Sequence, residues 1–250
     1  AGTSHYFGQN FTKPFDVKFQ NREGKQEYAY QTSWGISTRL IGAIIMAHGD
    51  NRGLKLPPKV APTQVVIIPI AMHKEGVKEK TEEIYNKLKT KYRMEIDLRE
   101  QVSPGYKFND WEMKGVPLRI EIGPRDIEKG ECILARRDNN EKITVKIEEL
   151  EKQIEEILEK IQNDMYEVCK KRIEEKTTIA HNLEEFQANI NKEQGFIKAM
   201  WCGNAECEAK IKELTSAKSR CIPFNQEHIG DTCVCCGKKA EKMVIWGRQY

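Results

Sequence analysis

Two closely spaced cysteine pairs constrain the fold of this chain more than any other feature of its sequence. Four residues separate Cys202 from Cys207, and two separate Cys233 from Cys236. Two such pairs can close a tetrahedral site of four thiolates, the typical ligand set of structural Zn²⁺. Cys235 is the alternative fourth ligand, but we favour Cys236, because a two-residue spacing lets backbone amides point at the sulfurs. The competing interpretation, ordinary buried thiols, is disfavoured by the pairing.

The remaining cysteines fall outside these pairs. Cys132 lies in a strand-like apolar run and Cys169 in a helical pattern, so we expect both in the core, together with Cys221. A closed four-thiolate site leaves no coordination position for water, and the predicted Zn²⁺ is therefore structural rather than catalytic. Metal-binding thiols fit a reducing compartment, and the polar segment 2–5 shows no signal-peptide pattern, so the predicted localisation is cytoplasmic.

Composition excludes several classes of protein. The chain has 250 residues, of which 32% are charged, and can bury one or two cores. Its most apolar run, residues 40–47, is far shorter than the roughly 20 residues of a membrane span. The formal net charge of +3 is too small to indicate nucleic-acid binding by itself, so RNA binding has to rest on local patches. We expect neither a membrane nor DNA among the partners.

Residues 1–60 predict an incomplete part of a larger domain. Alternating apolar and polar residues at 15–19 and 27–30, with a turn between them, predict a β-hairpin. The apolar run 39–48 predicts a buried helix. The two prolines at 57–58 cannot continue a helix and mark a domain edge. One hairpin and one helix cannot enclose a core of their own.

Residues 61–166 predict a small α/β domain. The β-branched run 65–68 is typical of a buried parallel strand, and the alternation of strands and helices after it predicts a mixed, largely parallel sheet. The further predicted elements are helices at 75–92 and 106–114 and strands at 94–98, 116–122 and 132–136. Apolar residues at three- and four-residue steps between 147 and 168 then predict a long amphipathic helix. Residues 167–250 form the third predicted domain, which carries the cysteine pairs.

Several short stretches carry a more specific signal. In residues 32–39, small side chains precede an arginine and an apolar helix, and the other informative stretches are 2–5, 48–58, 103–108, 111–119, 123–126 and 247–250. Their order resembles the C-terminal half of prolyl-tRNA synthetases of the archaeal and eukaryotic type, in which 32–39 is motif 3 of the class II enzymes. The resemblance implies an α/β fold, α+β overall. It comprises the end of an antiparallel catalytic sheet (1–60), an anticodon-binding domain with a mixed sheet (61–166) and a small α+β zinc-containing C-terminal domain (167–250).

The resemblance also implies an activity. A proline–tRNA ligase activates L-proline with ATP and Mg²⁺ to prolyl-adenylate, then transfers it to the 3′ end of tRNA(Pro). The residues implied for the pocket that holds proline and the tRNA 3′ end are Thr3, His5, Ser33, Trp34 and Gly35. Ser37 and Arg39 would contact ATP, since an arginine can stack on adenine and counter phosphate charge. Without the resemblance, His5 and Trp34 would be interpreted as structural residues. No catalytic residue is assigned, because positioning and charge stabilisation would dominate.

Four further residues are implied to bind the anticodon. Glu112 and Arg119 suit guanine, because a carboxylate accepts from its N1 and N2 hydrogens and an arginine forks onto O6 and N7. By the resemblance they read the two guanines of the proline anticodon, with Phe108 available for stacking and Lys142 assisting. The alternative interpretation is a set of solvated charges at a strand end.

Two hypotheses follow for the chain as a whole. Motifs 1 and 2 of the family, and the glutamine expected before Ala1, are absent, so we expect this chain alone to be catalytically incomplete. The favoured hypothesis is the C-terminal part of an active synthetase that forms a homodimer through its catalytic domain. The alternative is a non-catalytic, zinc-stapled module that binds the tRNA anticodon.

Overall fold

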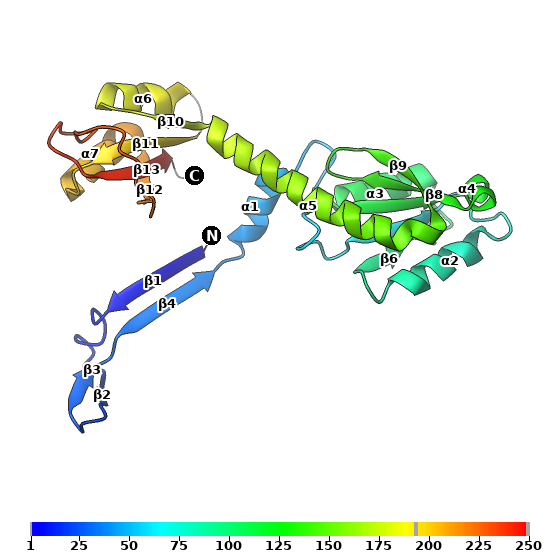
Figure 1. The fold of residues 1–250 in the computed structure, drawn as a ribbon, viewed down its shortest axis with the longest axis horizontal. Helices are drawn as coiled ribbons and strands as arrows, with labels where there is room; N and C mark the ends of the chain where they lie inside the picture. Colours follow the sequence, from blue (N-terminus) through cyan, green and yellow to red (C-terminus); the bar gives the residue numbers. More distant parts are fainter. Residues whose placement is uncertain (1, 193–194, 249–250) are drawn as a thin grey trace. The chain divides into compact units, whose positions relative to one another are not determined.

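The computed structural model describes residues 2–192 and 195–248 and contains two compact units, Ala1–Met165 and Tyr166–Tyr250. The α/β class predicted from the sequence is confirmed, with antiparallel and mixed sheets in the first unit and a four-stranded sheet in the second (Figure 1). The last two residues of the stretch 247–250 lie outside the described ranges, and the division into three domains stays a prediction. In the described ranges, no helix has both the length and the apolar character that crossing a membrane requires.

The N-terminal segment contains two antiparallel strand pairs. β1 (Gly2–Gly8) pairs with β4 (Gln31–Ile36), and β2 (Lys18–Gln20) pairs with β3 (Gln26–Tyr28) in the loop that joins them (Figure 1). The predicted hairpin is therefore confirmed as β2–β3. The resemblance implied an antiparallel sheet in residues 1–60, but the residue pattern by itself did not predict the longer β1–β4 pair, because its strands are separated by more than 20 residues of chain and its polar sequence lacks a clear alternation.

Helix α1 (Arg39–His48) directly follows β4 and has the predicted bounds. Its predicted burial is wrong: within the described chain none of its residues is buried, and Ile41 and Met46 are 63% and 68% exposed. The helix is nevertheless apolar along its length, so its side chains present an apolar surface to the solvent in this structure.

A five-stranded sheet forms the centre of the first unit. In spatial order its strands are β6 (Met94–Ile96), β5 (Val65–Pro69), β7 (Leu118–Ile122), β8 (Glu131–Arg136) and β9 (Lys142–Lys146). β5 runs parallel to β6 and β7, whereas β8 is antiparallel to both β7 and β9. The sheet is mixed, as predicted, but not largely parallel. The connections that lead into β8 and β9 are too short for a parallel crossover, which needs about a dozen residues or more.

Helices cover both faces of this sheet. They are α2 (Val77–Leu88), α3 (Pro104–Met113), the short α4 (Pro124–Lys129) and the first part of α5 (Leu150–Glu175). The main core lies on one face, where residues of β5 and β7, among them Ile67 and Ile120, belong to one cluster with residues of α2 and α5. On the other face, Val66 and Ile68 pack with Phe108 and Trp111 of α3. Since side chains alternate along a strand, Arg119 and Glu121 of β7 lie on the α3 face.

The predicted long helix is confirmed as α5. It begins after a 3₁₀ turn at Ile147–Glu149, and its apolar residues are buried as far as Met165. Val168, which the periodicity also placed on the apolar face, is 57% exposed.

The second unit is an α+β structure with its own core. Its four strands, in spatial order, are β10 (Thr177–Ile179), β11 (Phe196–Trp201), β13 (Lys242–Arg248) and β12 (Ala217–Cys221), and its helices are α6 (Leu183–Lys192) and α7 (Ala205–Thr215). Trp246 and Phe186 are fully buried and meet edge to face with ring centroids 6.0 Å apart. These aromatic side chains anchor the core of the unit.

The cysteines outside the two pairs differ in burial. Cys132 is fully buried in β8, as predicted, and Cys169 is half-buried on α5. Cys221, which was expected in the core, is exposed. It ends β12 just after a register irregularity at Ser219, and this shift takes its side chain out of the regular alternation of the strand.

Candidate nucleic-acid interface and metal centre

Helix α3 presents Phe108 and Trp111 to the sheet. Ser103 caps its N-terminus, where the side-chain hydroxyl accepts a hydrogen bond from the Tyr106 N–H at 3.3 Å, and Pro104 occupies the first turn. Phe108 and Trp111 pack on the sheet face that also carries Arg119. Glu112 follows Trp111 on α3 and contacts Arg119 of β7. The candidate site is therefore formed by α3 and β7 together.

Glu112, Arg119 and Glu121 form a nearly buried charge network on this face. The Arg119 guanidinium donates from Nη1 to Glu112 Oε1 at 3.0 Å, and from Nε and Nη2 to Glu121 Oε1 at 3.0 and 2.8 Å. Side-chain exposures of the three residues are 10%, 13% and 3% for Arg119, Glu112 and Glu121. All three nitrogens of the guanidinium are therefore engaged within the protein.

The planar face of Arg119 rests on an aromatic ring. Its Cζ atom lies 4.2 Å from the centroid of Phe108, and the ammonium of Lys142 lies 5.8 Å from the same centroid. Lys142 Nζ also donates to Glu121 Oε2 at 2.9 Å. The structure thus brings together all four residues that the sequence assigned to the anticodon, and it adds Glu121 to them.

Two cations at the rim complete the network. Arg52 Nη2 lies 2.7 Å from Glu112 Oε2, and Arg52 Nη1 donates to Asn140 Oδ1 at 2.9 Å. Arg52 and Lys142 are each 52% exposed, in contrast to Arg119. Sequence reasoning missed Arg52, because its partner lies 60 positions away. Glu121 could have been found from the sequence. In β7, Arg119 and Glu121 alternate with the apolar residues Leu118, Ile120 and Ile122, a pattern typical of a strand with one polar face.

A second charged group supports α3 from the end of β6. Asp97 is 3% exposed and accepts hydrogen bonds from Arg99 Nη2 at 2.7 Å and from Trp111 Nε1 at 2.8 Å. Burial raises the pKa of the Asp97 carboxyl, but these hydrogen bonds outweigh it and hold the pKa at about 2. Arg99 Nη2 also donates to Asp110 of α3 at 2.8 Å. This group holds the helix in place beneath the site.

The residues implied for proline and ATP lie on β1, β4 and the start of α1. Across the strand pair, Thr3 is opposite Gly35 and His5 is opposite Ser33. These four positions share one face of the pair, because side chains alternate along each strand, whereas Trp34 lies on the other face and is 78% exposed. Ser37 and Arg39 follow β4 directly, and Arg39 opens α1.

The four predicted metal ligands converge in the second unit. The Sγ atoms of Cys202, Cys207, Cys233 and Cys236 all lie within 4.8 Å of one another. The Cys202–Cys207 and Cys202–Cys236 sulfur distances are 3.7 and 3.8 Å. A tetrahedral Zn²⁺ with sulfurs about 2.3 Å away places its ligands about 3.8 Å apart, so the donor set fits this ion. Cys235 instead packs against the hydrophobic clusters of the unit.

The backbone around Cys233 favours the thiolate form of this residue. Burial raises the pKa of the Cys233 thiol, but hydrogen bonds from the backbone N–H groups of Cys236, Cys235 and Cys202 lower it to about 7. Burial raises the pKa of Cys207, and the neighbouring sulfurs raise it further. A positive ion among the four sulfurs would remove this repulsion, because metal ligation stabilises the deprotonated form.

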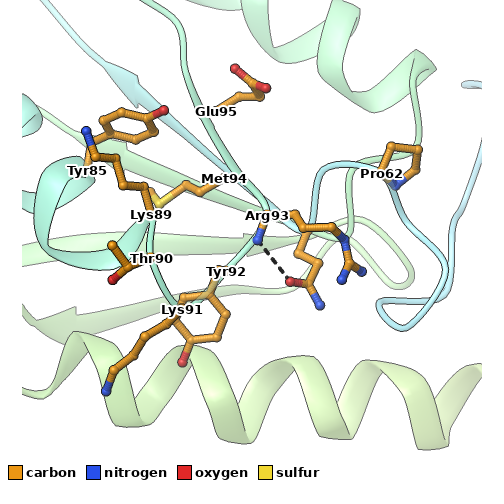
Figure 2. A pocket seen from close by; sticks show the side chains of 10 residues that line it. Pro62, Tyr85, Lys89, Thr90, Lys91, Tyr92, Arg93, Met94 and Glu95 are labelled. Carbon is orange, nitrogen blue, oxygen red and sulfur yellow. Dashed lines mark hydrogen bonds between the residues drawn. The ribbon is translucent and has the colours of Figure 1, made fainter.

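A polar hollow near the start of β6 has a structural role. Figure 2 shows Tyr85, Lys89, Arg93 and Glu95 around it, and the Arg93 N–H donates to Gln64 Oε1 at 3.2 Å. The Arg93 guanidinium donates to the carbonyl oxygens of Ala61 and Pro58 at 2.9 Å. These bonds fasten the segment that precedes β5 to the edge of the sheet.

Comparisons with known proteins show what this chain is similar to. Residues 64–157 match the family model described as anticodon binding domain, and residues 183–250 match the model described as prolyl-tRNA synthetase, C-terminal. Over all 250 residues the chain is 57% identical to a proline–tRNA ligase of Clostridium botulinum (strain Langeland / NCTC 10281 / Type F) and 51% identical to one of Oceanobacillus iheyensis. The chain corresponds to the C-terminal region of the prolyl-tRNA synthetases. It spans about half the length of these curated relatives, 52% in both cases.

A solved structure of the same family has the same fold. The crystal structure of prolyl-tRNA synthetase from Cryptosporidium parvum, complexed with L-proline and AMP, matches the whole chain with a TM-score of 0.93 at 45% identity and is covered over 54% of its own length. The resemblance to the prolyl-tRNA synthetases that the sequence motifs of this chain indicated is therefore confirmed at the level of the family.

Proposed function

We propose that this chain is part of a proline–tRNA ligase. In the first reaction the carboxylate of L-proline attacks the α-phosphate of ATP and releases pyrophosphate, and in the second a ribose hydroxyl at the 3′ end of tRNA(Pro) attacks the adenylate and releases AMP. The observation that carries the proposal is the 57% identity to a curated proline–tRNA ligase over the full length of the chain. The exposed apolar surface of α1 supports a longer parent protein, because further chain would cover it.

The proposed substrate site lies on the β1–β4 pair. Thr3, His5, Ser33 and Gly35 would bind proline and the tRNA 3′ end from one face of the strands, and Trp34 would contribute from the other face or through its edge. Ser37 and Arg39 would contact ATP, with Mg²⁺ held by its phosphates. Gly35 leaves room for close approach, because a Cβ atom at this position would meet nothing within 4 Å in the described structure.

The proposed anticodon site is the network on the α3 face of the sheet. Glu112 would accept from guanine, Arg119 would hold Glu112 and donate to the second base, Phe108 would support the stack, and Lys142 would assist at the rim. Two nearly buried carboxylates beside arginine and an aromatic ring support this assignment.

The cysteine cluster would hold one structural Zn²⁺ through Cys202, Cys207, Cys233 and Cys236. Four thiolates occupy every tetrahedral position, so this ion would supply fold stability and no chemistry. We further propose that the parent protein is a cytoplasmic homodimer that associates through its catalytic domain, as the resemblance implies.

The full-length protein tests the proposal directly. Proline-dependent exchange of pyrophosphate into ATP, together with aminoacylation of tRNA(Pro), is the expected result. Binding of an anticodon hairpin is measured alongside. Hairpin binding that discriminates the anticodon guanines, without any proline-dependent exchange, would leave only a non-catalytic RNA-binding module.

A further inference from the structure

Arg52 lies where an anticodon base would have to enter. The two carboxylate oxygens of Glu112 differ in their contacts: Oε1 accepts from Arg119 at 3.0 Å, whereas Oε2 is shielded from solvent, forms no hydrogen bond among the described residues and lies 2.7 Å from Arg52 Nη2 as an ion pair. Guanine offers two hydrogens, on N1 and N2, to such a carboxylate. Because Oε2 is covered, a base reaches it only when a neighbouring side chain moves aside, and the two arginines in contact with the carboxylate are the candidates.

The two arginines are held very differently. Arg119 is 10% exposed, donates twice to Glu121 and stacks on Phe108, so its displacement would also break both hydrogen bonds to the buried Glu121 carboxylate. Arg52 is 52% exposed, and within the described residues its side chain has one hydrogen bond, to Asn140, besides the contact with Glu112. The arginine side of this ion pair is open to solvent, and a solvated partner adds little to the stability of such a pair.

The backbone that carries Arg52 is fixed, so only its side chain can move. Asp50 and Gly53 exchange two backbone hydrogen bonds of 3.0 and 3.1 Å, and the Arg52 N–H donates to Asp50 Oδ1 at 2.9 Å. A Cβ atom on Gly53 would lie 2.5 Å from the Cα of Met113, one residue after Glu112. The turn thus places the Arg52 side chain at a set position beside the carboxylate.

We propose that Arg52 is a specificity-determining residue that occupies Glu112 in the absence of RNA and is displaced by guanine. This inference rests on the proposed anticodon function of Glu112. Arg52 supplies a counter-charge to the carboxylate when the site is empty. A base that offers hydrogens to Glu112 compensates for the lost ion pair, whereas adenine, which has no hydrogen on N1, does not. Arg52 acts through Glu112 and is a positioning residue rather than a catalytic one.

The test is the affinity of the full-length protein for two RNA hairpins. One carries the proline anticodon, and in the other both anticodon guanines are replaced by adenine. Arg52→Gln removes the competing cation and keeps a group able to bond Asn140. We expect it to tighten binding of the guanine hairpin about two- to fivefold, the range of an exposed ion pair, and to leave the adenine hairpin unchanged. Arg52→Lys, which keeps a cation, should restore the wild-type affinity.

Two controls make the result specific. In a Glu112→Gln background, Arg52→Gln should have no further effect, because the two residues act on one another. Arg125→Gln removes an exposed arginine of α4 in the same domain and should not tighten binding. Proline-dependent pyrophosphate exchange without tRNA should be the same in the wild type and in Arg125→Gln.

Several outcomes would overturn the inference. Equal weakening of both hairpins by Arg52→Gln would make Arg52 a contact to RNA phosphates, and equal tightening or no change would separate it from guanine recognition. The proposed function fails separately: if Glu112→Gln leaves the discrimination between the hairpins intact, Glu112 does not read guanine. If Glu112→Gln abolishes discrimination while Arg52→Gln has no effect, only the role of Arg52 is lost.

Discussion

Arg137 and Asp50, 87 positions apart in the chain, form a two-pronged ion pair: Arg137 Nη1 and Nη2 donate to the two carboxylate oxygens of Asp50 at 3.0 and 2.7 Å. Arg137 is 3% exposed, and its Nε donates to the carbonyl oxygen of Glu112 at 3.0 Å. Lys55 Nζ lies 3.0 Å from the same carboxylate. The turn after α1 is in this way fixed to the C-terminal end of α3, which carries Glu112, a residue of the proposed anticodon site.

Removal of the Asp50 carboxylate should destabilise the first unit. Asp50→Asn leaves the Arg137 guanidinium buried without a counter-charge, and we expect a loss of about 2 to 4 kcal/mol in the free energy of unfolding. Chemical denaturation followed by tryptophan fluorescence measures this loss. Asp16→Asn, which removes a carboxylate whose side chain is 69% exposed, is the matched control and should change stability far less, because solvent screens its ion pair. Equal effects of the two variants would contradict a structural role for the Arg137–Asp50 pair.

Asp97 should contribute a pH-dependent part of the stability. Its pKa is about 2 in the folded chain against an ordinary value of 3.8, so the folded state prefers the charged form. The contribution, about 2 kcal/mol, is present in full above the unfolded pKa and is lost as the pH falls through about 2. The difference in unfolding free energy between wild type and Asp97→Asn should therefore shrink between pH 5 and pH 2. A difference that is independent of pH would mean that the ionised form of Asp97 is not what stabilises the fold.

Metal removal should unfold the second unit. We expect one Zn²⁺ per chain by elemental analysis, and its removal by a chelator should destabilise residues 166–250 by about 3 kcal/mol or more, since ligand binding to the folded state adds to folding free energy. Cys233→Ser should have the same effect as the chelator. Cys221→Ser, at an exposed thiol outside the cluster, should keep the full metal content. Zinc retained by Cys233→Ser would refute the four-thiolate assignment.

Cys236 and Cys235 should differ in their effect on the metal. Cys236 Sγ lies 3.8 Å from Cys202 Sγ, whereas the Cys235 side chain packs in the core clusters. Cys236→Ser should therefore weaken zinc binding by orders of magnitude, and Cys235→Ala should keep the metal and cost about 1 to 2 kcal/mol through lost packing. Competition with a chromogenic chelator measures both affinities. The opposite order would exchange the two residues in the ligand set.

The sequence predicted those elements whose pattern is local. The uninterrupted apolar run of β5 and the regular steps along α5 are such signals, because burial on both faces or on one helical face leaves a periodic record. The strand β9 was missed, since three of its five residues are polar or charged and it lies at the edge of the sheet. Burial of α1 was wrongly predicted for a related reason: an apolar run records that a helix has an apolar partner but not whether that partner lies in the same piece of chain.

The two candidate sites also differ in how much of each the sequence could predict. The spacing of the cysteines was sufficient to select the four sulfurs that converge, because short-range geometry limits which pairs can chelate one ion. The sequence revealed only part of the charge network around Glu112. Glu112 and Arg119 came from the family resemblance, but Arg52 reaches Glu112 through a fold contact that no local pattern encodes. The mutual engagement of Glu112 and Arg119, which changes what either can offer to RNA, also required the structure.

The close backbone approach at Gly53 has a consequence for how this chain can be cut. The Leu54 and Leu56 N–H groups donate to the carbonyl oxygens of Met113 and Gly115 at 3.0 and 3.2 Å, and a Cβ atom on Gly115 would lie 2.6 Å from Leu54 Cβ. A fragment trimmed at residue 61, the domain edge that the prolines suggest, would leave these two carbonyls without donors and Arg137 without Asp50. Residues 50–56 therefore belong structurally to the domain built on the five-stranded sheet. A fragment that keeps this domain intact has to begin before residue 50.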